Sequence, residues 1–262
     1  MNAIIDSLLN HKSIRKFKDK PIDEKTLNLI LEAGIRAPNG ANLQRYSLVV
    51  IDDQEQKKAL QKICYDQQFI GQAAICIAAL VDMFRLNLWF ELNDAPVQHD
   101  SENNLLPGDL FGAYWDAILA LHNAVIAAES MGLGTCYVGS FLTVNIQEMF
   151  NAPEHVFPAG LVCIGYPDEE PELEVRLPLE AVIHRNNYQI PTNEDIKKHY
   201  RIIDKYWEKP SERKKELEKE GIHNIAQYIT NRYYPRDIII SGNKNILENI
   251  RRAKINLTNV KD

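Results

Sequence analysis

The chain has 262 residues, of which 45% are hydrophobic, 25% charged and 8% aromatic. This composition is typical of a globular protein with one large or two small domains, and average shares of Gly and Pro exclude collagen-like and low-complexity chains. No stretch approaches the ~18 consecutive apolar residues of a membrane span, and the N-terminal residues lack a signal-peptide pattern. We therefore expect a cytoplasmic protein without a membrane partner.

The net charge of -6 is unevenly distributed. Residues 191–262 carry 16 Lys and Arg against 11 Asp and Glu, whereas the rest of the chain carries 14 against 25. Because nucleic acids are bound by clustered basic residues, the acidic first part argues against a nucleic-acid partner. The basic last part is expected to lie on an acidic surface or to be a solvated face.

The first half of the chain predicts helices and buried strands in alternation. A short helix over 2–10 is followed by a helix that begins after Asp23 as N-cap and ends before Pro38, which disfavours helical geometry in the residue before it. The β-branched and apolar runs 46–51 and 73–81 predict buried strands, with a helix near 53–63 between them. Residues 82–110 show no period and predict a loop or an irregular helical insertion.

The second half continues the pattern. Residues 112–131 predict an interior helix that ends at Gly132, with His122 as a hydrogen-bonded interior residue. A strand at 134–138, a helix near 144–150 and a strand at 159–166 follow, and the acidic run 168–174 predicts a solvated loop. Such an alternation favours an α+β or α/β sheet with helices on both faces.

The tail after residue 190 predicts four helices with narrow apolar stripes. These stripes are too narrow to build a separate hydrophobic core for ~70 residues. We therefore expect residues 1–190 to form the main domain and residues 191–262 to form a helical extension packed on it or on a second subunit.

Most familiar catalytic motifs are missing. Gly132 to Gly139 (GLGTCYVG) lies after a helix and before a strand, the reverse of a dinucleotide-binding fingerprint. There is no P-loop and no nucleophile elbow. The four Cys form no C-x-x-C pair and the seven His no zinc-type pair, so we expect reduced core thiols and no metal.

Two polar segments contain residues that are suited to binding a ligand. Residues 11–20 (HKSIRKFKDK) hold five Lys or Arg and a serine in an otherwise acidic region, which suits a phosphate. Residues 38–46 (PNGANLQRY) place Asn42 and Gln44 in a turn before a strand, where amides can recognise a flat heterocycle. Basic loops and Asn-rich turns are also common without any ligand.

In order along the chain, these segments resemble the nitroreductase family. The matching elements are the basic motif with Ser13 and Arg15, the loop with Asn42 and Gln44, the GLGTC segment, a P-E-x-x-x-P segment from Pro153, and an R-x-P-L-E element from Arg176. The resemblance covers residues 4–188. It implies an α+β fold with a mostly antiparallel central sheet flanked by helices, and an intertwined homodimer with two FMN sites at the interface.

The resemblance also implies roles for individual residues. The FMN phosphate and ribityl chain would be held by His11, Lys12, Ser13 and Arg176, and the pyrimidine edge by Arg15. Residues Pro38, Asn39, Asn42 and Gln44 would approach the flavin from the other protomer. The ring would lie along Tyr137, Val138, Gly139 and Ser140, with a backbone N–H near N5.

The sequence departs from the family pattern at three positions. His11 stands where Arg is usual, Arg45 where Pro is usual, and Glu174 where some members have a phosphate-binding Lys. The first and third changes reduce the positive charge near the phosphate. A weaker FMN site, or compensation by a residue such as Arg185, would follow.

The implied activity is hydride transfer from NADH or NADPH to FMN and then, in ping-pong fashion, to a small nitroaromatic, quinone or activated-alkene acceptor. Two alternatives remain open. One is a specialised flavin chemistry, such as reductive dehalogenation or flavin breakdown, with a lid from residues 82–110 or the tail. The other is a flavin-binding protein without turnover.

Overall fold

The computed structural model describes residues 2–96, 100, 103–143, 146–208 and 212–257. The chain forms two compact units, residues 1–172 with 242–262 and residues 173–241, and each is described by itself. These boundaries differ from the sequence-based division at residue 190. That division into a flavin domain and an extension stays a prediction.

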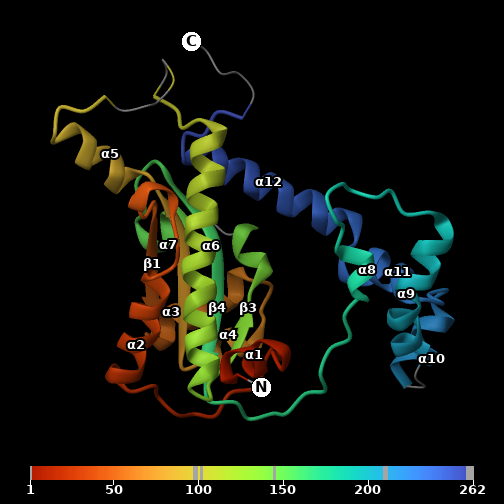
Figure 1. Cartoon of the computed structure of the whole chain (residues 1–262). Coiled ribbons are helices and arrows are strands. Elements are labelled where there is room, and N and C mark those ends of the chain that lie inside the picture. Colours follow the sequence, from red (N-terminus) through yellow and green to blue (C-terminus); the bar gives the residue numbers. More distant parts are fainter. Residues whose placement is uncertain (1, 97–99, 101–102, 144–145, 209–211, 258–262) are drawn as a thin grey trace. The chain divides into compact units, whose positions relative to one another are not determined.

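The first unit contains most of the regular structure (Figure 1). Its helices and strands follow in the order α1 (Ala3–Leu9), α2 (Glu24–Ile35), β1 (Tyr46–Ile51), α3 (Gln54–Ile63), α4 (Gln68–Gln72), β2 (Ile75–Asp82), α5 (Phe84–Glu91), α6 (Pro107–Ser130), β3 (Gly134–Tyr137), α7 (Ile146–Phe150), β4 (Val156–Gly165) and the end of α12 (Arg236–Arg252). Short 3-10 helices span Gly40–Asn42 and Gly139–Thr143.

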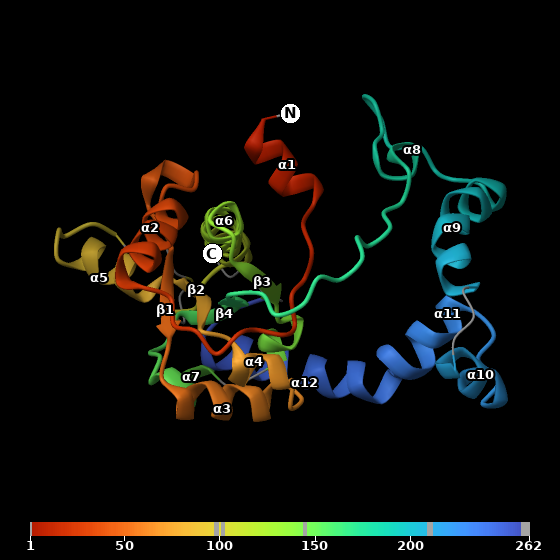
Figure 2. The same cartoon turned by 90° about the horizontal axis from the view of Figure 1, so that it is seen from below.

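The four strands form one sheet in the order β1-β2-β4-β3, and every neighbouring pair is antiparallel. Both faces of β2 are buried, because Ile75, Ile77, Ala79 and Val81 enter one apolar cluster while alternate residues enter the other. Figure 2 shows α2 and α6 on one side of the sheet and α3 and α4 on the other. The antiparallel sheet flanked by helices confirms the predicted fold class.

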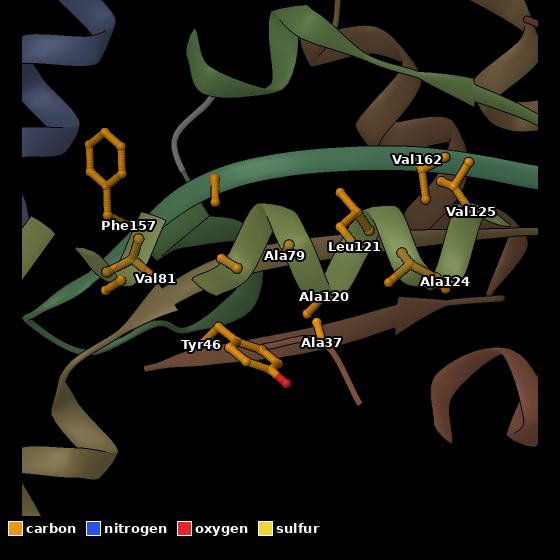
Figure 3. Close-up of a cluster of buried hydrophobic side chains, with 14 of the residues drawn as sticks. Ala37, Tyr46, Ala79, Val81, Ala120, Leu121, Ala124, Val125, Phe157 and Val162 are labelled. Atoms are coloured by element: carbon orange, nitrogen blue, oxygen red, sulfur yellow. The ribbon is translucent and has the colours of Figure 1, made fainter. Parts of the chain in front are cut away.

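Helix α6 packs closely on its neighbours, and small side chains line the stripe that approaches Gly34 of α2. Five alanines on one face are fully buried: Ala113, Ala117, Ala120, Ala124 and Ala128. Their spacing of three and four residues places them on one stripe of the helix. Figure 3 shows Ala120 near Ala37, and Leu121 and Val125 in the same apolar cluster. The small side chains let the helix backbone approach its neighbours.

The ends of α6 follow local signals. Gly132, at a φ of +79°, ends the helix as predicted, and the N–H of Leu133 donates to the carbonyl of Ala128 at 3.1 Å. The helix begins at Pro107, five residues before the predicted start, because proline suits the first turn of a helix. Together with α5, this replaces part of the loop or irregular insertion that we expected over residues 82–110.

Strand β4 begins at Val156, earlier than the predicted start at 159, and therefore contains Pro158. Proline cannot donate a ladder hydrogen bond and is tolerated in sheets at irregular positions. The pairing register of β2 shifts between Ala79 and Leu80, and Leu80 is the residue opposite Pro158. The β-bulge thus explains how the strand accommodates the proline.

One face of α6 stays open in the single chain. Trp115 and Phe111 are 68% and 67% exposed. His122 is exposed as well, so the prediction of an interior histidine is wrong for the single chain; its Nδ1 lies 3.3 Å from the Tyr137 hydroxyl. Among the described residues α6 is the one helix long and apolar enough to cross a membrane, a property that its packing in the core also accounts for.

The end of the basic tail packs on the first unit. The N–H of Leu105 donates to the Lys254 carbonyl at 2.8 Å, and the N–H of Asn256 donates to the Leu105 carbonyl at 3.0 Å. Ala253 and Ile255 are buried in the cluster that contains α6. Residues 253–256 therefore continue the core that the first 172 residues build.

The second unit is helical, with α8 (Leu179–Val182), α9 (Asn193–Glu208), α10 (Glu212–Lys219), α11 (Ile225–Tyr228) and the start of α12. Of its described residues, Leu217 and Ile222 are the buried hydrophobic ones. The rings of Trp207 and Tyr228 lie 5.2 Å apart. Long helices with so little buried surface agree with the narrow stripes of the sequence.

All four cysteines are free and buried, as predicted. Burial raises the pKa of Cys64 to about 12 and also raises the pKa values of Cys136 and Cys163. Because the thiolate is the reactive form, native protein at about pH 8 should resist alkylation. Iodoacetamide and mass spectrometry should find almost no modification in native protein and four modified cysteines in denaturant. Rapid labelling of native protein would contradict this burial.

Packing of the C-terminal residues can be tested at Ile255. Replacing this buried residue with alanine should lower the free energy of unfolding by about 2–4 kcal/mol, because the core loses apolar contacts and gains a cavity. The matched control is Leu257→Ala, since Leu257 is 43% exposed. Equal denaturation midpoints for the two variants would mean that residues 253–256 do not belong to the core.

Candidate functional site

The basic segment lies along the edge strand β3. Ser13 forms a parallel bridge with Thr135, and the N–H of Ile14 donates to the Thr135 carbonyl at 2.8 Å. The approach requires glycine at position 134, because a Cβ there would lie 2.7 Å from Cγ1 of Ile14. The glycine-containing segment thus lets the basic segment lie against the sheet.

Glu129, in the last turn of α6, fixes this arrangement. Its carboxylate Oε1 lies 2.8 Å from Nδ1 of His11 and also accepts a hydrogen bond from the Thr135 hydroxyl. The Glu129 side chain is only 15% exposed. His11 therefore has a carboxylate partner, and Glu129 joins the basic segment, α6 and β3 at one point.

The acidic run after β4 also contacts the basic segment. Oε1 of Glu169 accepts the backbone N–H groups of Arg15 and Lys16, the latter at 3.0 Å, and Glu170 forms an ion pair with Lys12. Glu170 is 84% exposed, as expected for a solvated loop, but both glutamates also contact the basic segment, which the sequence did not indicate. The positive charge concentrated in residues 11–20 attracts the carboxylates that lie nearest to this segment.

These residues line a cavity of about 410 Å³. It is bounded by the basic segment, the end of α6 and the glycine segment, with the lining residues Ser7, Asn10, His11, Lys12, Ile14, Glu129, Gly132, Leu133, Gly134, Pro167 and Glu170. Its wall contains hydrogen-bond donors and acceptors, and both basic and acidic side chains. Two of the predicted phosphate residues, His11 and Lys12, lie in its wall.

The predicted ring-binding segment begins where β3 ends. Arg15 lies close enough to Cys136 to offset part of the rise that burial causes in that thiol's pKa. Tyr137 and Gly139 are exposed, whereas Val138 is buried. A Cβ built at Gly139 meets no atom within 4 Å. The structure therefore brings Ser13, Arg15 and residues 137–140 to one edge of the sheet, with open space beside Gly139.

Gln67 is a candidate that the sequence analysis did not single out. Its Nε2 donates to the Cys64 carbonyl at 2.9 Å and to the Ser140 hydroxyl at 3.0 Å. It therefore adjoins the ring-binding segment from the turn before α4. No spacing in the sequence pairs residues 67 and 140, so only the fold could reveal this contact.

The loop with Asn42 and Gln44 lies elsewhere on α6. Asp116 accepts hydrogen bonds from Gly40 and Arg45, whereas Glu129 holds His11. These two carboxylates are 13 residues apart, which is about 20 Å along a helix at ~1.5 Å per residue. One chain thus holds the two halves of the predicted site well apart.

The remaining predicted residues have simpler surroundings. Pro38 is exposed, and Asn39 is half-buried with its Oδ1 accepting the Gln44 N–H at 3.0 Å. Arg176 belongs to the second unit, where Nη1 donates to the Val175 carbonyl at 3.2 Å.

The donor set fits a phosphate group. Within the described residues the guanidinium of Arg15 and the hydroxyl of Ser13 have no hydrogen-bond partner, and the only partner of the Lys12 ammonium is Glu170, which is 84% exposed. An ion pair with so exposed a carboxylate is weak. A phosphate could replace Glu170 as the partner of Lys12 and accept a hydrogen bond from the Ser13 hydroxyl.

Comparisons with known proteins show which proteins this chain resembles. The profile described as "Nitroreductase family" matches residues 8–166. The FMN reductase [NAD(P)H] of Bacillus subtilis is 32% identical over 242 residues, which cover 90% of this chain and 94% of that protein.

Two solved structures have the same fold. A Bacteroides fragilis protein is 30% identical with a TM-score of 0.85, covering 96% of this chain and all of the other. The NADPH:FMN oxidoreductase of Vibrio harveyi, in complex with NAD⁺, is 26% identical with a TM-score of 0.73, covering 94% and 98%. With the family profile matched over most of the chain, this protein belongs to the nitroreductase family.

Proposed function

We propose that this protein is an FMN-dependent oxidoreductase that takes hydride from NADH or NADPH and reduces small nitroaromatic, quinone or activated-alkene acceptors in a ping-pong reaction. One observation carries the proposal: the basic segment and residues 137–140 meet at one sheet edge, held by Glu129 and Thr135. Family membership and relatives named as FMN reductases support the same conclusion.

The chain's own residues would bind and orient the cofactor. Lys12 and Ser13 would hold the phosphate, and Arg15 would place a positive charge at the pyrimidine edge. FMN held there would supply the redox chemistry that couples oxidation of the nicotinamide to reduction of the acceptor. A guanidinium at this edge would stabilise the negative charge that develops on reduction.

The protein would work as a homodimer. The two halves of the predicted site lie about 20 Å apart along α6 of one chain, so Asn42 and Gln44 would serve the flavin of a second protomer. Exposed apolar side chains on α1 and α6, among them Leu9 at 60% and Trp115 at 68%, give a second copy a surface to cover. A cytoplasmic location follows from the sequence expectations above.

The cofactor can be identified directly. Purified protein should be yellow, heat should release FMN, and the colour should bleach when NADH or NADPH is added without oxygen. Chromatography of the released chromophore and absorbance measurements check both points. Finding FAD, or no flavin after reconstitution, would overturn the proposal, and a colour that persists with both nucleotides would favour a binding protein without turnover.

The roles of Arg15 and Lys12 can be separated by substitution. Lys12→Ala should raise the Kd for FMN about tenfold, because a charged hydrogen bond to the phosphate is lost. Arg15→Ala should lower the reduction rate of flavin-saturated protein about a hundredfold, because it removes charge stabilisation during hydride transfer. Lys16→Ala, an equal change in charge on the same segment, is the control. Equal reduction rates in the flavin-saturated Arg15 and Lys12 variants would show that the assignment is wrong.

A further inference from the structure

The loop before β1 has an unusual backbone. Ala41, Asn42 and Gln44 have φ values of 50°, 57° and 50°, the left-handed region that L-residues rarely adopt. Three such residues within four positions cost conformational free energy, so the surroundings must hold them in place. The same loop carries both amides predicted to reach the flavin.

A carboxylate from α6 holds one side of this loop. Oδ2 of Asp116 accepts from Nε of Arg45 at 2.9 Å, and Oδ1 accepts the N–H of Gly40 at 3.3 Å. The Asp116 side chain is 6% exposed and that of Arg45 is 16% exposed. One buried carboxylate thus contacts both ends of the stretch that contains Ala41, Asn42 and Gln44.

Glycines make room for this ion pair. A Cβ on Gly112 would lie 2.8 Å from Nη1 of Arg45, and a Cβ on Gly40 would lie 2.9 Å from its Nη2. The guanidinium therefore packs against two backbone positions that carry no side chain.

A second arginine holds the loop from the other side. Nη2 of Arg85 donates to the carbonyls of Gln44 and Tyr46 at 2.6 and 2.9 Å. The backbone N–H of Arg85 in turn donates to Asp82 at 3.0 Å. The loop backbone is thus bonded at Gly40 and at Gln44, whereas the Asn42 side chain is exposed and its Oδ1 accepts from Nε2 of Gln44 at 3.4 Å.

We propose that Asp116 and Arg45 are positioning residues that hold Asn42 and Gln44 in a flavin-ready conformation before the cofactor binds. The inference rests on the proposed function. A buried ion pair stabilises a fold little more than apolar residues of the same size, so fold stability alone does not explain it. Holding the loop in advance lowers the ordering cost of binding.

Two variants test this role. In Asp116→Asn, an NH2 group replaces one carboxylate oxygen and cannot accept a hydrogen bond. Either Arg45 or Gly40 therefore loses its acceptor at this side chain. In the double variant Arg45→Met/Asp116→Leu, apolar side chains replace the whole ion pair. The control is Lys57→Met, which removes a buried cation that donates to the Ala73 and Ala74 carbonyls on the opposite side of the sheet.

Three measurements on each protein are needed: the melting temperature, the Kd for FMN from fluorescence quenching, and hydrogen exchange of the amides of residues 40–45 without flavin. We expect the double variant to melt close to the wild type, yet to raise the Kd on the order of tenfold, the scale of one lost charged hydrogen bond. Exchange in the loop should become faster in both loop variants and stay unchanged in Lys57→Met.

Unchanged Kd and loop exchange in a folded double variant would overturn the inference. If that variant does not fold, Asp116→Asn decides by the same criteria. A rise in Kd that merely follows the fall in melting temperature, and that Lys57→Met reproduces, would show a structural role and also overturn it. Wild-type protein that binds no FMN would overturn the proposed function itself, and with it the role of the loop.

Discussion

Close packing of α6 on the sheet is the constraint on which the rest of the structure depends. Its buried alanines let the helix backbone approach α2, where Ala120 and Ala124 lie next to Gly34, while Leu121 packs against Gly160 of β4. The helix then presents Asp116 near its middle and Glu129 in its last turn. Because these carboxylates hold the two polar segments, the position of α6 determines where both halves of the site lie.

Local signals explain why most of the fold could be predicted from the sequence. Asp23 caps α2 by accepting the Thr26 N–H at 2.9 Å, Gly132 ends α6, and the continuous apolar run of β2 indicates a strand buried on both faces. Each signal acts within a few residues of the chain. The errors came where a distant contact overrides the local pattern, as at Pro158, which depends on a bulge in the neighbouring strand.

The sequence predicted which segments contribute to the site, but not which side chains of distant segments contact one another. Ser13 and Arg15 stand out by composition, whereas Glu129 pairs with a residue 118 positions away and looked like a polar exception on an apolar helix. Asp116 is similar, since its partner Arg45 is 71 positions distant. Sequence spacing contains no information about such pairs, because the fold alone brings them together.

The contact between Lys12 and Glu170 has a consequence for how an anion enters the site. In the free chain the lysine is already neutralised by a carboxylate of its own chain. An incoming phosphate therefore competes with an internal anion and returns Glu170 to water. Binding at this position is an exchange of one negative group for another, so its net electrostatic gain is smaller than the charge of Lys12 suggests and depends on how well water solvates the released carboxylate.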